Sequence, residues 1–533
     1  MNRLIRRANK KLSLSNAATL LVVTSLFGQV LGFLRVKLVN GNFDYLGPNS
    51  TDAFFAAFKI PDFFYFTIAA GALGVAFMPI LAEHLQKHDR KGVWELSTSL
   101  MNFLALIMLF IGLLIFVFAE PLIHNVVAPD LGPTQLRNAV IIMRLIAFNP
   151  LLFTISGILT SVQQTFGRFF FFAVAPLVYN SSIIISIFVF KDNIGLIGLG
   201  IGALIGALLQ LAIAAIGITG LNFKYHKLID FKAPDFRRIL RQLPPRSLDQ
   251  GITSLNSIVN TNFARRLGTG NITFYENAYV LHTAPTLLIG TAISSAVFPR
   301  FNNSLAKGKK EEFREEFLQV LRVLIWITTP VVVVGFFARG YLARIIFSQA
   351  APEIATVFGF LAGAIFFRTI YTIVSRYFYA QKDTWSPLID SLFAIVLNIA
   401  LVSVLARKTT YGIAGIALAE SIVAGFQLLI LTLIMLYRDP KLFDIHFWGG
   451  VGRIFSITGF TVVATFIMVS LFPLQLSDVG FLSLGFKLVL ITSVTFSVHL
   501  ALSKLFGLEE AEPIFKKLGN IRKFMFKQFR VNV

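Results

Sequence analysis

The chain has 533 residues, of which 56% are hydrophobic, and it carries a formal net charge of +21. A soluble domain is usually about 45–50% apolar, so this composition predicts a protein with many membrane-spanning helices. Cysteine is absent, which excludes disulfides, thiolate metal sites and a cysteine nucleophile. The basic residues lie mainly in short loops and tails, which favours anionic lipid headgroups over nucleic acid as their partner.

The first apolar run follows a basic N-terminus, so it could be a signal peptide or a membrane helix. From Asn16 to about Val39 it is longer than the core of a signal peptide, and no convincing small-residue cleavage site precedes Arg35. We interpret it as an uncleaved first transmembrane helix.

A bilayer core needs about 20 mostly apolar residues per helix, and the sequence contains about fourteen such runs. They predict an all-α polytopic membrane protein with helices near 16–39, 52–82, 94–119, 136–160, 168–190, 194–220, 240–266, 272–300, 314–338, 353–380, 386–406, 411–437, 450–473 and 481–505. The seventh run is the least regular, because prolines and charges interrupt it.

Lysines and arginines are divided unevenly between alternate loops. If the N-terminus is cytoplasmic, the connections on that side and the C-terminal tail carry most of them, and Arg265 and Arg266 are among the exceptions. This asymmetry predicts an even number of helices with both termini on the cytoplasmic side of the cell membrane.

The two halves of the chain share a short pattern. Ala76-Phe-Met-Pro79 ends one glycine-containing run, and Ala296-Val-Phe-Pro299 ends another at the corresponding place. Parallel repeats of this kind build transporters with the substrate site between the halves. We predict an N-terminal lobe of six helices (1–220), a cytoplasmic linker (221–239), a C-terminal lobe of six helices (240–437), two further helices (438–508) and a basic amphipathic tail (509–533).

The second run carries charges that are costly inside a membrane. Asp52, Lys59 and Asp62 lie near its start, and charges there usually face a bundle interior or a wet cavity. The residues that predict a bend or hinge in this run are Pro61, Gly71 and Gly74. A bent, charged helix is typical of a transport pathway; a helix kinked for packing, with its charges at the interface, is the alternative.

Arg35 and Lys37 of the first run lie close in sequence to the charged start of the second run, which holds Asp52 and Lys59. Pairing of Arg35 or Lys59 with Asp52 would reduce the cost of burial, and an arginine is suited to bidentate phosphate binding. Alternatively, these side chains reach outward to lipid headgroups, which is the interpretation we favour for Lys37.

The seventh and eighth runs add a second polar group. Arg246 and Asp249 follow Pro244-Pro245, and Glu276 and His282 follow later. A Pro-Pro break would free backbone carbonyls beside a wet cavity, whereas Arg246 and Asp249 could simply neutralise each other. A lone histidine is more often a packing residue than a proton carrier. Three further charges, Arg368, Asp390 and Glu420, could pair or line an inner vestibule.

Motifs of soluble enzymes are absent from the sequence. There is no P-loop, no HExxH and no Cys/His metal pattern, so we expect no enzyme activity, no metal and no cofactor. The glycine-rich run from Gly195 to Gly206 has small-xxx-small spacing, which indicates close helix packing rather than a nucleotide loop.

Three motifs together resemble the signature of the MurJ (MviN) family of lipid II flippases, within the multidrug/oligosaccharidyl-lipid/polysaccharide exporter superfamily. They are Val30-Leu-Gly-Phe-Leu-Arg35, Thr51-Asp-Ala-Phe-Phe-Ala-Ala-Phe-Lys-Ile-Pro61 and Ala76-Phe-Met-Pro-Ile-Leu-Ala-Glu83. The resemblance implies two six-helix lobes, two extra helices forming a lipid-side groove, and alternating access driven by an ion or the membrane potential.

The same resemblance implies substrate-pathway roles for Arg35, Asp52 and Lys59. The chain departs from the family at Gln29, Tyr65 and Phe66, which stand in place of arginines. Our hypothesis is that Arg246 replaces part of this missing set of cations. The departures leave the substrate more open than the fold.

We therefore expect a flippase for lipid II or a related polyprenyl-diphosphate glycan, with Arg35, Asp52, Lys59, Asp62, Arg246, Asp249 and Glu276 along the pathway and Pro61, Gly71, Gly74, Pro244 and Pro245 as hinges. The alternatives are an exporter of another polyprenyl-linked glycan or an amphipathic drug, and a non-transporting scaffold for wall synthesis. The expected partners are the lipid substrate and anionic membrane lipids, with a monomer favoured.

Overall fold

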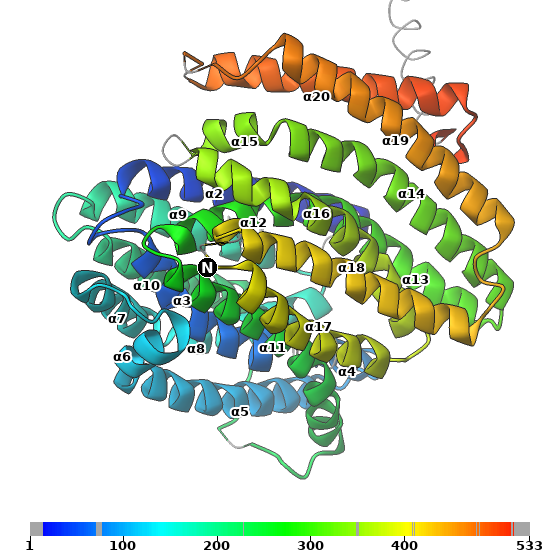
Figure 1. Cartoon of the computed structure of the whole chain (residues 1–533). Coiled ribbons are helices and arrows are strands. Elements are labelled where there is room, and N and C mark those ends of the chain that lie inside the picture. Colours follow the sequence, from blue (N-terminus) through cyan, green and yellow to red (C-terminus); the bar gives the residue numbers. More distant parts are fainter. Residues whose placement is uncertain are drawn as a thin grey trace, which may run out of the picture. The chain divides into compact units, whose positions relative to one another are not determined.

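The computed structural model describes residues 14–70, 77–227, 229–347, 351–407, 409, 411–475, 477–478, 480–512 and 515. Every regular element in these ranges is a helix, as the composition predicts (Figure 1). The α-helices are α2 (Leu14–Asn42), α3 (Asp52–Phe64), α4 (Met78–Gln86), α5 (Arg90–Val117), α6 (Ala119–Pro121), α7 (Pro133–Ile146), α8 (Asn149–Thr165), α9 (Phe170–Phe190), α10 (Ile197–Ile218), α11 (Pro234–Arg266), α12 (Asn271–Pro285), α13 (Ala292–Ala306), α14 (Lys310–Phe337), α15 (Arg339–Ile346), α16 (Ala351–Ala380), α17 (Trp385–Leu405), α18 (Ile413–Arg438), α19 (Ile445–Leu471) and α20 (Phe481–Leu505). Three π-helices, η1 (Tyr65–Ala70), η3 (Leu122–Val127) and η4 (Thr286–Thr291), and the 3₁₀ turn η5 (Glu509–Ala511) complete the description.

Twelve helical segments of the described chain are long and apolar enough to cross a membrane. They coincide with twelve of the predicted runs, so the chain is a multi-pass helical membrane protein. The other two runs also form helices. The run 52–82 is divided among α3, η1 and α4, and the run 240–266 lies in α11, which has 33 residues but is too polar. The count of fourteen therefore stays a prediction.

Prolines interrupt the helical geometry at matching places in the two halves. Pro61 lies near the end of α3 and π-helix η1 follows; Pro285 ends α12 and π-helix η4 follows. Proline cannot donate to the carbonyl four residues before it, so wider turns and bends gather at such positions. The succeeding helices α4 and α13 carry Pro79 and Pro299, the residues that indicated a repeat in the sequence.

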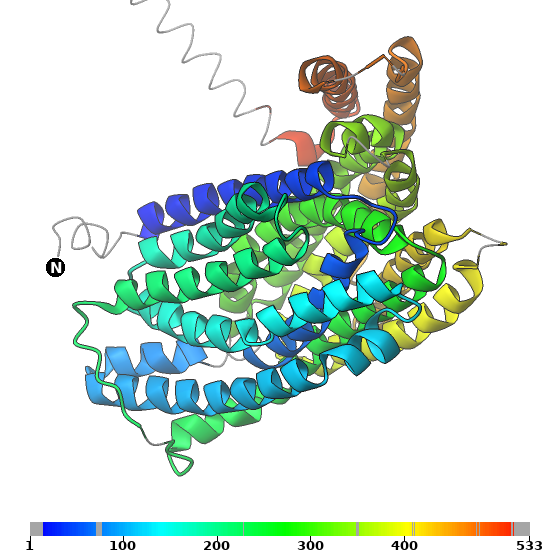
Figure 2. The same cartoon turned by 90° about the vertical axis from the view of Figure 1, so that its left-hand side faces the viewer.

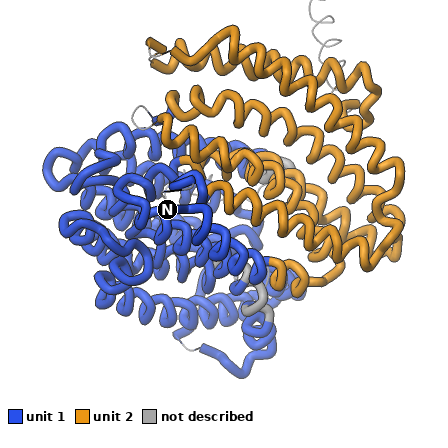
Figure 3. The backbone as a smooth tube through the Cα atoms, viewed as in Figure 1, with its two compact units in different colours: residues 1–277, 346–350, 391–416 blue, residues 278–345, 351–390, 417–533 orange. Residues whose placement is uncertain are grey.

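Two compact units divide the chain (Figure 3). Unit 1 comprises residues 1–277, 346–350 and 391–416, and unit 2 comprises residues 278–345, 351–390 and 417–533. Helix α11, which was predicted to open the second lobe, groups with the helices before it. The lobe boundaries drawn from the sequence repeat stay a prediction.

Close packing of small residues joins helices within unit 1. Helices α2, α9 and α10 lie side by side (Figure 2). A Cβ atom at Gly202 of α10 would lie 2.2 Å from Oγ of Ser186, and one at Gly206 would lie 2.9 Å from Cδ2 of Tyr179, both on α9. The glycine-rich run thus brings α10 onto α9, as its spacing predicts.

In unit 2, the last two spanning helices pack on each other and on α14. A buried polar seam joins them: Nε1 of Trp326 donates to Oγ of Ser503 at 2.9 Å, and Oγ1 of Thr461 lies 3.1 Å from Nδ1 of His499. Large apolar side chains, including Phe460 and Phe486, are exposed on the same helices, as expected of a surface that faces lipid. The predicted amphipathic tail lies mostly outside the described residues.

Candidate functional site

Asp52, the first residue of α3, is fully buried and holds the start of α12. Its carboxylate accepts hydrogen bonds from the backbone N–H of Gly270 (2.6 Å), the backbone N–H of Thr273 (2.9 Å) and the hydroxyl of Thr273 (2.7 Å). The first N–H groups of a helix have no partner within it, so Asp52 caps α12 from a distant segment of the chain. Arg265 lies 3.8 Å from the same carboxylate.

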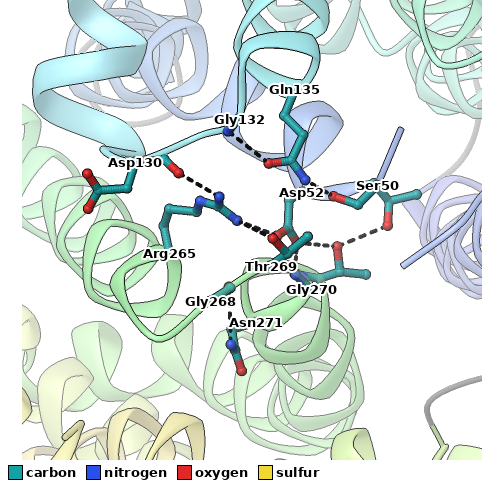
Figure 4. A network of polar contacts seen from close by, with 12 residues as sticks. Ser50, Asp52, Asp130, Gly132, Gln135, Arg265, Gly268, Thr269, Gly270 and Asn271 are labelled. Atoms are coloured by element: carbon teal, nitrogen blue, oxygen red, sulfur yellow. Dashed lines mark hydrogen bonds and ion pairs between the residues drawn. The ribbon is translucent and has the colours of Figure 1, made fainter. Parts of the chain in front are cut away.

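Three segments of unit 1 meet around this carboxylate, as Figure 4 shows. Arg265 donates to the carbonyl of Asp130 at 2.6 Å, and the amide of Gln135 donates to the hydroxyl of Ser50 at 2.8 Å. The network therefore ties the beginnings of α3, α7 and α12 to the end of α11. Sequence reasoning placed Arg265 among loop cations; the structure buries it to 7% exposure.

Lys59, two turns further along α3, binds a different acid. Its Nζ lies 2.5 Å from Oε1 of Glu276 on α12 and 2.7 Å from Oγ of Ser257 on α11. The expected pairing of Lys59 or Arg35 with Asp52 is therefore wrong, because Asp52 is already satisfied by the α12 cap and Arg265. The side chains of Lys59 and Glu276 retain 12% and 16% exposure, so the pair is not sealed from its surroundings.

Asp62 lines a small pocket beside Pro61 of α3. It lies within electrostatic range of Lys59, Arg35 and Glu276, so two cations and two acids gather here. The pocket has a volume of about 10 Å³, roughly the space that one water needs. Its walls are Phe58, Pro61, Asp62, Tyr65, Ile146, Asn149, Pro150, Phe153 and Tyr179. Arg35 is half-buried, whereas Lys37 is exposed, as the outward interpretation of Lys37 requires.

A second buried polar cluster lies within unit 2. Arg368 of α16 binds Oε1 of Glu420 at 2.6 Å and Oε1 of Gln427 at 2.6 Å, both on α18. Gln427 in turn donates to Oδ2 of Asp390 at 3.3 Å. Arg368 and Glu420 thus form an ion pair, one of the two arrangements that the sequence left open, and Gln427 is the member that sequence reasoning missed. His282 is also buried in this unit and packs beside Tyr279.

The sequence of this chain matches a known protein family over most of its length. Residues 44–492 match the MurJ family, which is described as "Lipid II flippase MurJ". This chain belongs to the MurJ family. Its relatives include the "Probable lipid II flippase MurJ" of Bdellovibrio bacteriovorus, which is 24% identical over 80% of this chain and 82% of that protein. The "Lipid II flippase MurJ" of Burkholderia cenocepacia is 26% identical over 77% of this chain and 81% of that protein.

Solved structures bear out the MurJ fold. "Lipid II flippase MurJ, inward closed conformation" superposes with a TM-score of 0.75 at 23% identity, covering 92% of this chain and 98% of that one. A "multidrug resistance MATE family transporter of the MOP superfamily" in an inward-facing conformation gives a TM-score of 0.65 at 16% identity, covering 80% and 98%. The helical architecture is therefore the one that MurJ shares with the wider superfamily.

Against the MurJ resemblance, the aromatic pair Tyr65-Phe66 stands where arginines were expected. Tyr65 begins η1, lines the small pocket beside Asp62 and packs edge-on against Phe153, with ring centroids 5.6 Å apart. The cations that the structure brings to α3 are instead Arg35, Lys59 and Arg265. Aromatic residues in place of two expected arginines make this part of α3 and η1 less basic.

Several predicted site residues, or their side chains, lie outside the part of the chain that the structure describes. Gly71 and Gly74 lie outside the described residues, as do the side chains of Pro244, Pro245, Arg246 and Asp249. The backbone of α11 is helical through all four of these last positions, so the predicted Pro-Pro break is wrong. Among the residues that the structure describes, no group of three acidic or histidine side chains could hold a metal ion.

Proposed function

We propose that this MurJ-family protein is a flippase that moves lipid II, a polyprenyl-diphosphate-linked peptidoglycan precursor, from the inner to the outer leaflet for cell-wall synthesis. The observation that carries the proposal is the half-buried Lys59, held by Glu276 and Ser257 within an apolar helical bundle. A diphosphate leaving water needs compensating cations and hydrogen-bond donors. The names of the curated relatives supply the identity of the substrate.

Lys59 and Arg35 have the chemistry that a diphosphate requires. Three donors on an ammonium group and a planar guanidinium fork bind phosphate oxygens strongly. In the substrate-free arrangement Glu276 neutralises Lys59, and Asp62 lies within range of both cations. Substrate binding would exchange the carboxylate of Glu276 for a phosphate oxygen, so the charge on Lys59 stays compensated throughout.

The Asp52 network would close one end of the pathway during alternating access. It joins three loops of unit 1 around one buried carboxylate, and α3 contains Pro61 shortly before the π-helix η1. With both termini in the cytoplasm, this end faces outward and the basic loops face the anionic inner leaflet. Arg246, Asp249 and the hinge residues Pro61, Gly71 and Gly74 join the pathway in this proposal. The substrate crosses unchanged, so the protein acts as a transporter rather than an enzyme.

A different cargo is favoured by one observation, the loss of the expected arginines at Tyr65 and Phe66. An exporter of another polyprenyl-linked glycan or an amphipathic drug would need fewer cations along α3. A non-transporting scaffold would need none, and pathway substitutions would then leave its activity unchanged.

Reconstitution tests these possibilities directly. Proteoliposomes containing lipid II are assayed for translocation with the wild-type protein, Arg35→Ala, Asp52→Ala and the matched control Lys37→Ala, which removes an exposed cation of the same helix. Wild type and Lys37→Ala should transport, whereas the other two should lose at least tenfold. Absence of translocation by the wild-type protein would refute lipid II as the substrate. Wild-type rates in Arg35→Ala would favour another polyprenyl-linked glycan or an amphipathic drug as the cargo.

A further inference from the structure

A histidine at the end of α4 lies between two carboxylates that come from different helices. Nδ1 of His84 is 2.8 Å from Oδ2 of Asp89, and Nε2 of His84 is 3.0 Å from Oδ2 of Asp235. Asp89 precedes α5, and Asp235 lies in the first turn of α11. The imidazole therefore connects three helices of unit 1, well away from the Asp52 and Lys59 contacts.

Geometry fixes the protonation state that this arrangement needs. A carboxylate can only accept hydrogen bonds, so both ring nitrogens of His84 must donate. A neutral imidazole has one donor and one acceptor nitrogen, and the acceptor would face a carboxylate oxygen. Only the imidazolium, with two N–H groups, satisfies both acids at once.

Both carboxylates lie at the beginnings of helices, where a negative charge is favoured. Oδ1 of Asp89 accepts the N–H of Gly92 at 2.8 Å and so caps α5. This bond and the contact with His84 hold the pKa of Asp89 below its usual value. Asp235 is in the first turn of α11, where the helix dipole favours a negative charge. The two acids therefore remain acceptors while the imidazole changes charge.

Gly92 is a second, independent sign that the pair is built into the fold. A Cβ atom at Gly92 would lie 2.1 Å from Oδ2 of Asp89 and 2.6 Å from Nδ1 of His84. Any side chain there would push the imidazole and the carboxylate apart. The absence of a side chain at position 92 is what allows His84 to approach the start of α5.

Charged residues next to the His84 contacts on α4, α5 and α11 have partners of their own. Glu83, the residue before His84, binds Arg238 of α11 at 3.0 Å, and both of these side chains are exposed. Lys91 pairs with Glu95 on the outer face of α5. Helix α8, which also packs against α4, contains no ionisable residue. Asp89 and Asp235 are thus the groups whose hydrogen bonds depend on the charge of His84.

We propose that His84, while doubly protonated, clasps the end of α4 to the first turn of α11, and that deprotonation of the imidazole releases one of the two carboxylates. Imidazoles change charge between about pH 5 and 8. The clasp is therefore closed in mildly acidic conditions and loosened in mildly basic ones. It does not depend on which substrate the protein carries.

The lack of native cysteine permits a direct measurement. Spin labels on Gln86→Cys and Arg241→Cys, both exposed and outside the clasp, report the α4–α11 distance in the full-length protein in lipid nanodiscs. The wild-type background should give one narrow distance distribution at pH 5.5 and a broader or longer one at pH 8.5. In His84→Gln the two pH values should give the same distribution, while His124→Gln, which removes an exposed histidine of the same unit, should keep the wild-type response.

Two further variants keep the test independent of the folding of His84→Gln. Asp235→Asn removes the charge that the second N–H meets, so the change in distance should move to lower pH. Gly92→Ala should give the broad distribution already at pH 5.5. The clasp is refuted if the wild-type distribution is the same at both pH values, or if His84→Gln keeps the wild-type pH response.

Discussion

Separating a structural role of the Lys59–Glu276 pair from a substrate role is the most direct test of the pathway. Lys59→Met removes the cation and keeps most of the side-chain length, and Glu276→Gln removes the opposite charge and keeps the shape. The double variant removes both charges. Lys59 also binds Ser257 at 2.7 Å, so the single substitution breaks two contacts of the ammonium group.

The expected size of each effect follows from the geometry. Removing one partner of a buried ion pair typically costs about 3–5 kcal/mol, because the other charge is left uncompensated. Nζ of Lys59 and Oε1 of Glu276 are 2.5 Å apart, but the two side chains retain 12% and 16% exposure. Partial access to water places the loss for either single variant at the lower end, about 3 kcal/mol. The double variant leaves no charge unpaired, so it should recover about 2 kcal/mol of the summed loss.

Stability and transport are then measured on the same four proteins. Free energies of unfolding come from denaturant titration in detergent, and translocation comes from proteoliposomes containing lipid II. If Lys59 binds the diphosphate, Lys59→Met and the double variant should both lose at least tenfold in rate, even though the double variant leaves neither charge unpaired. Glu276→Gln keeps the cation and should retain more transport than either.

Two results would refute this reasoning. Wild-type transport by the double variant would make the pair purely structural. Wild-type stability of both single variants would mean that Lys59 and Glu276 do not pair as the geometry states. Lys37→Met, which removes an exposed cation, controls for the loss of any positive charge.

Three other outcomes follow from particular contacts. Asp52→Asn should lower the free energy of unfolding by about 3 kcal/mol, since the amide turns its NH₂ toward donors; unchanged denaturant midpoints would contradict the capping of α12. Gly206→Leu should lower the free energy of unfolding by about 1–3 kcal/mol, because the larger side chain overpacks α9 against α10. Gly459→Leu, at a glycine with open space around it, should be tolerated. Size-exclusion chromatography of the two variants checks this difference. The pKa of Asp89 is lowered by the N–H of Gly92 and by His84, so its stabilising contribution is present above about pH 4 and lost as the pH falls further; Asp89→Asn should flatten the acid side of a thermal-stability profile, and an unchanged profile would contradict this.

The membrane helices were predictable because each depends only on its own apolar length. Twelve predicted runs coincide with helices that meet the length and apolarity of a membrane span. The π-helix η1 follows Pro61 at the place where the sequence predicted an irregular helix, since proline removes a donor wherever it lies in a helix. Pro244 and Pro245 show the limit of that rule, because the chain remains helical through them and no break follows.

Partners of the polar residues were much harder to predict. The distance in sequence between Asp52 and Thr273 is 221 residues, and the sequence offers many cations that could have met this acid. Arg265 was counted among the loop cations, at the end of the predicted run 240–266, yet it is buried beside Asp52. Gln427 carried no signal at all, since an uncharged amide in a membrane helix has no sequence pattern that marks it. Such contacts depend on tertiary packing that local spacing does not contain.

The contacts of α3 explain why one residue can position another. Asp52 binds Gly270 and Thr273, and Lys59, seven residues later on the same face, binds Glu276. Residue numbers rise together along α3 and residues 271–277 of α12, so these two segments of unit 1 run in the same direction with their register fixed at the Asp52 end. Loss of the cap would let α12 slide or fray against α3 and would move Glu276 away from Lys59. We therefore expect Asp52→Asn and Lys59→Met to be non-additive in transport: the double variant should be no slower than Lys59→Met alone. Independent, multiplying losses in the two single variants would show that Asp52 acts on the substrate pathway by a route other than the position of Lys59.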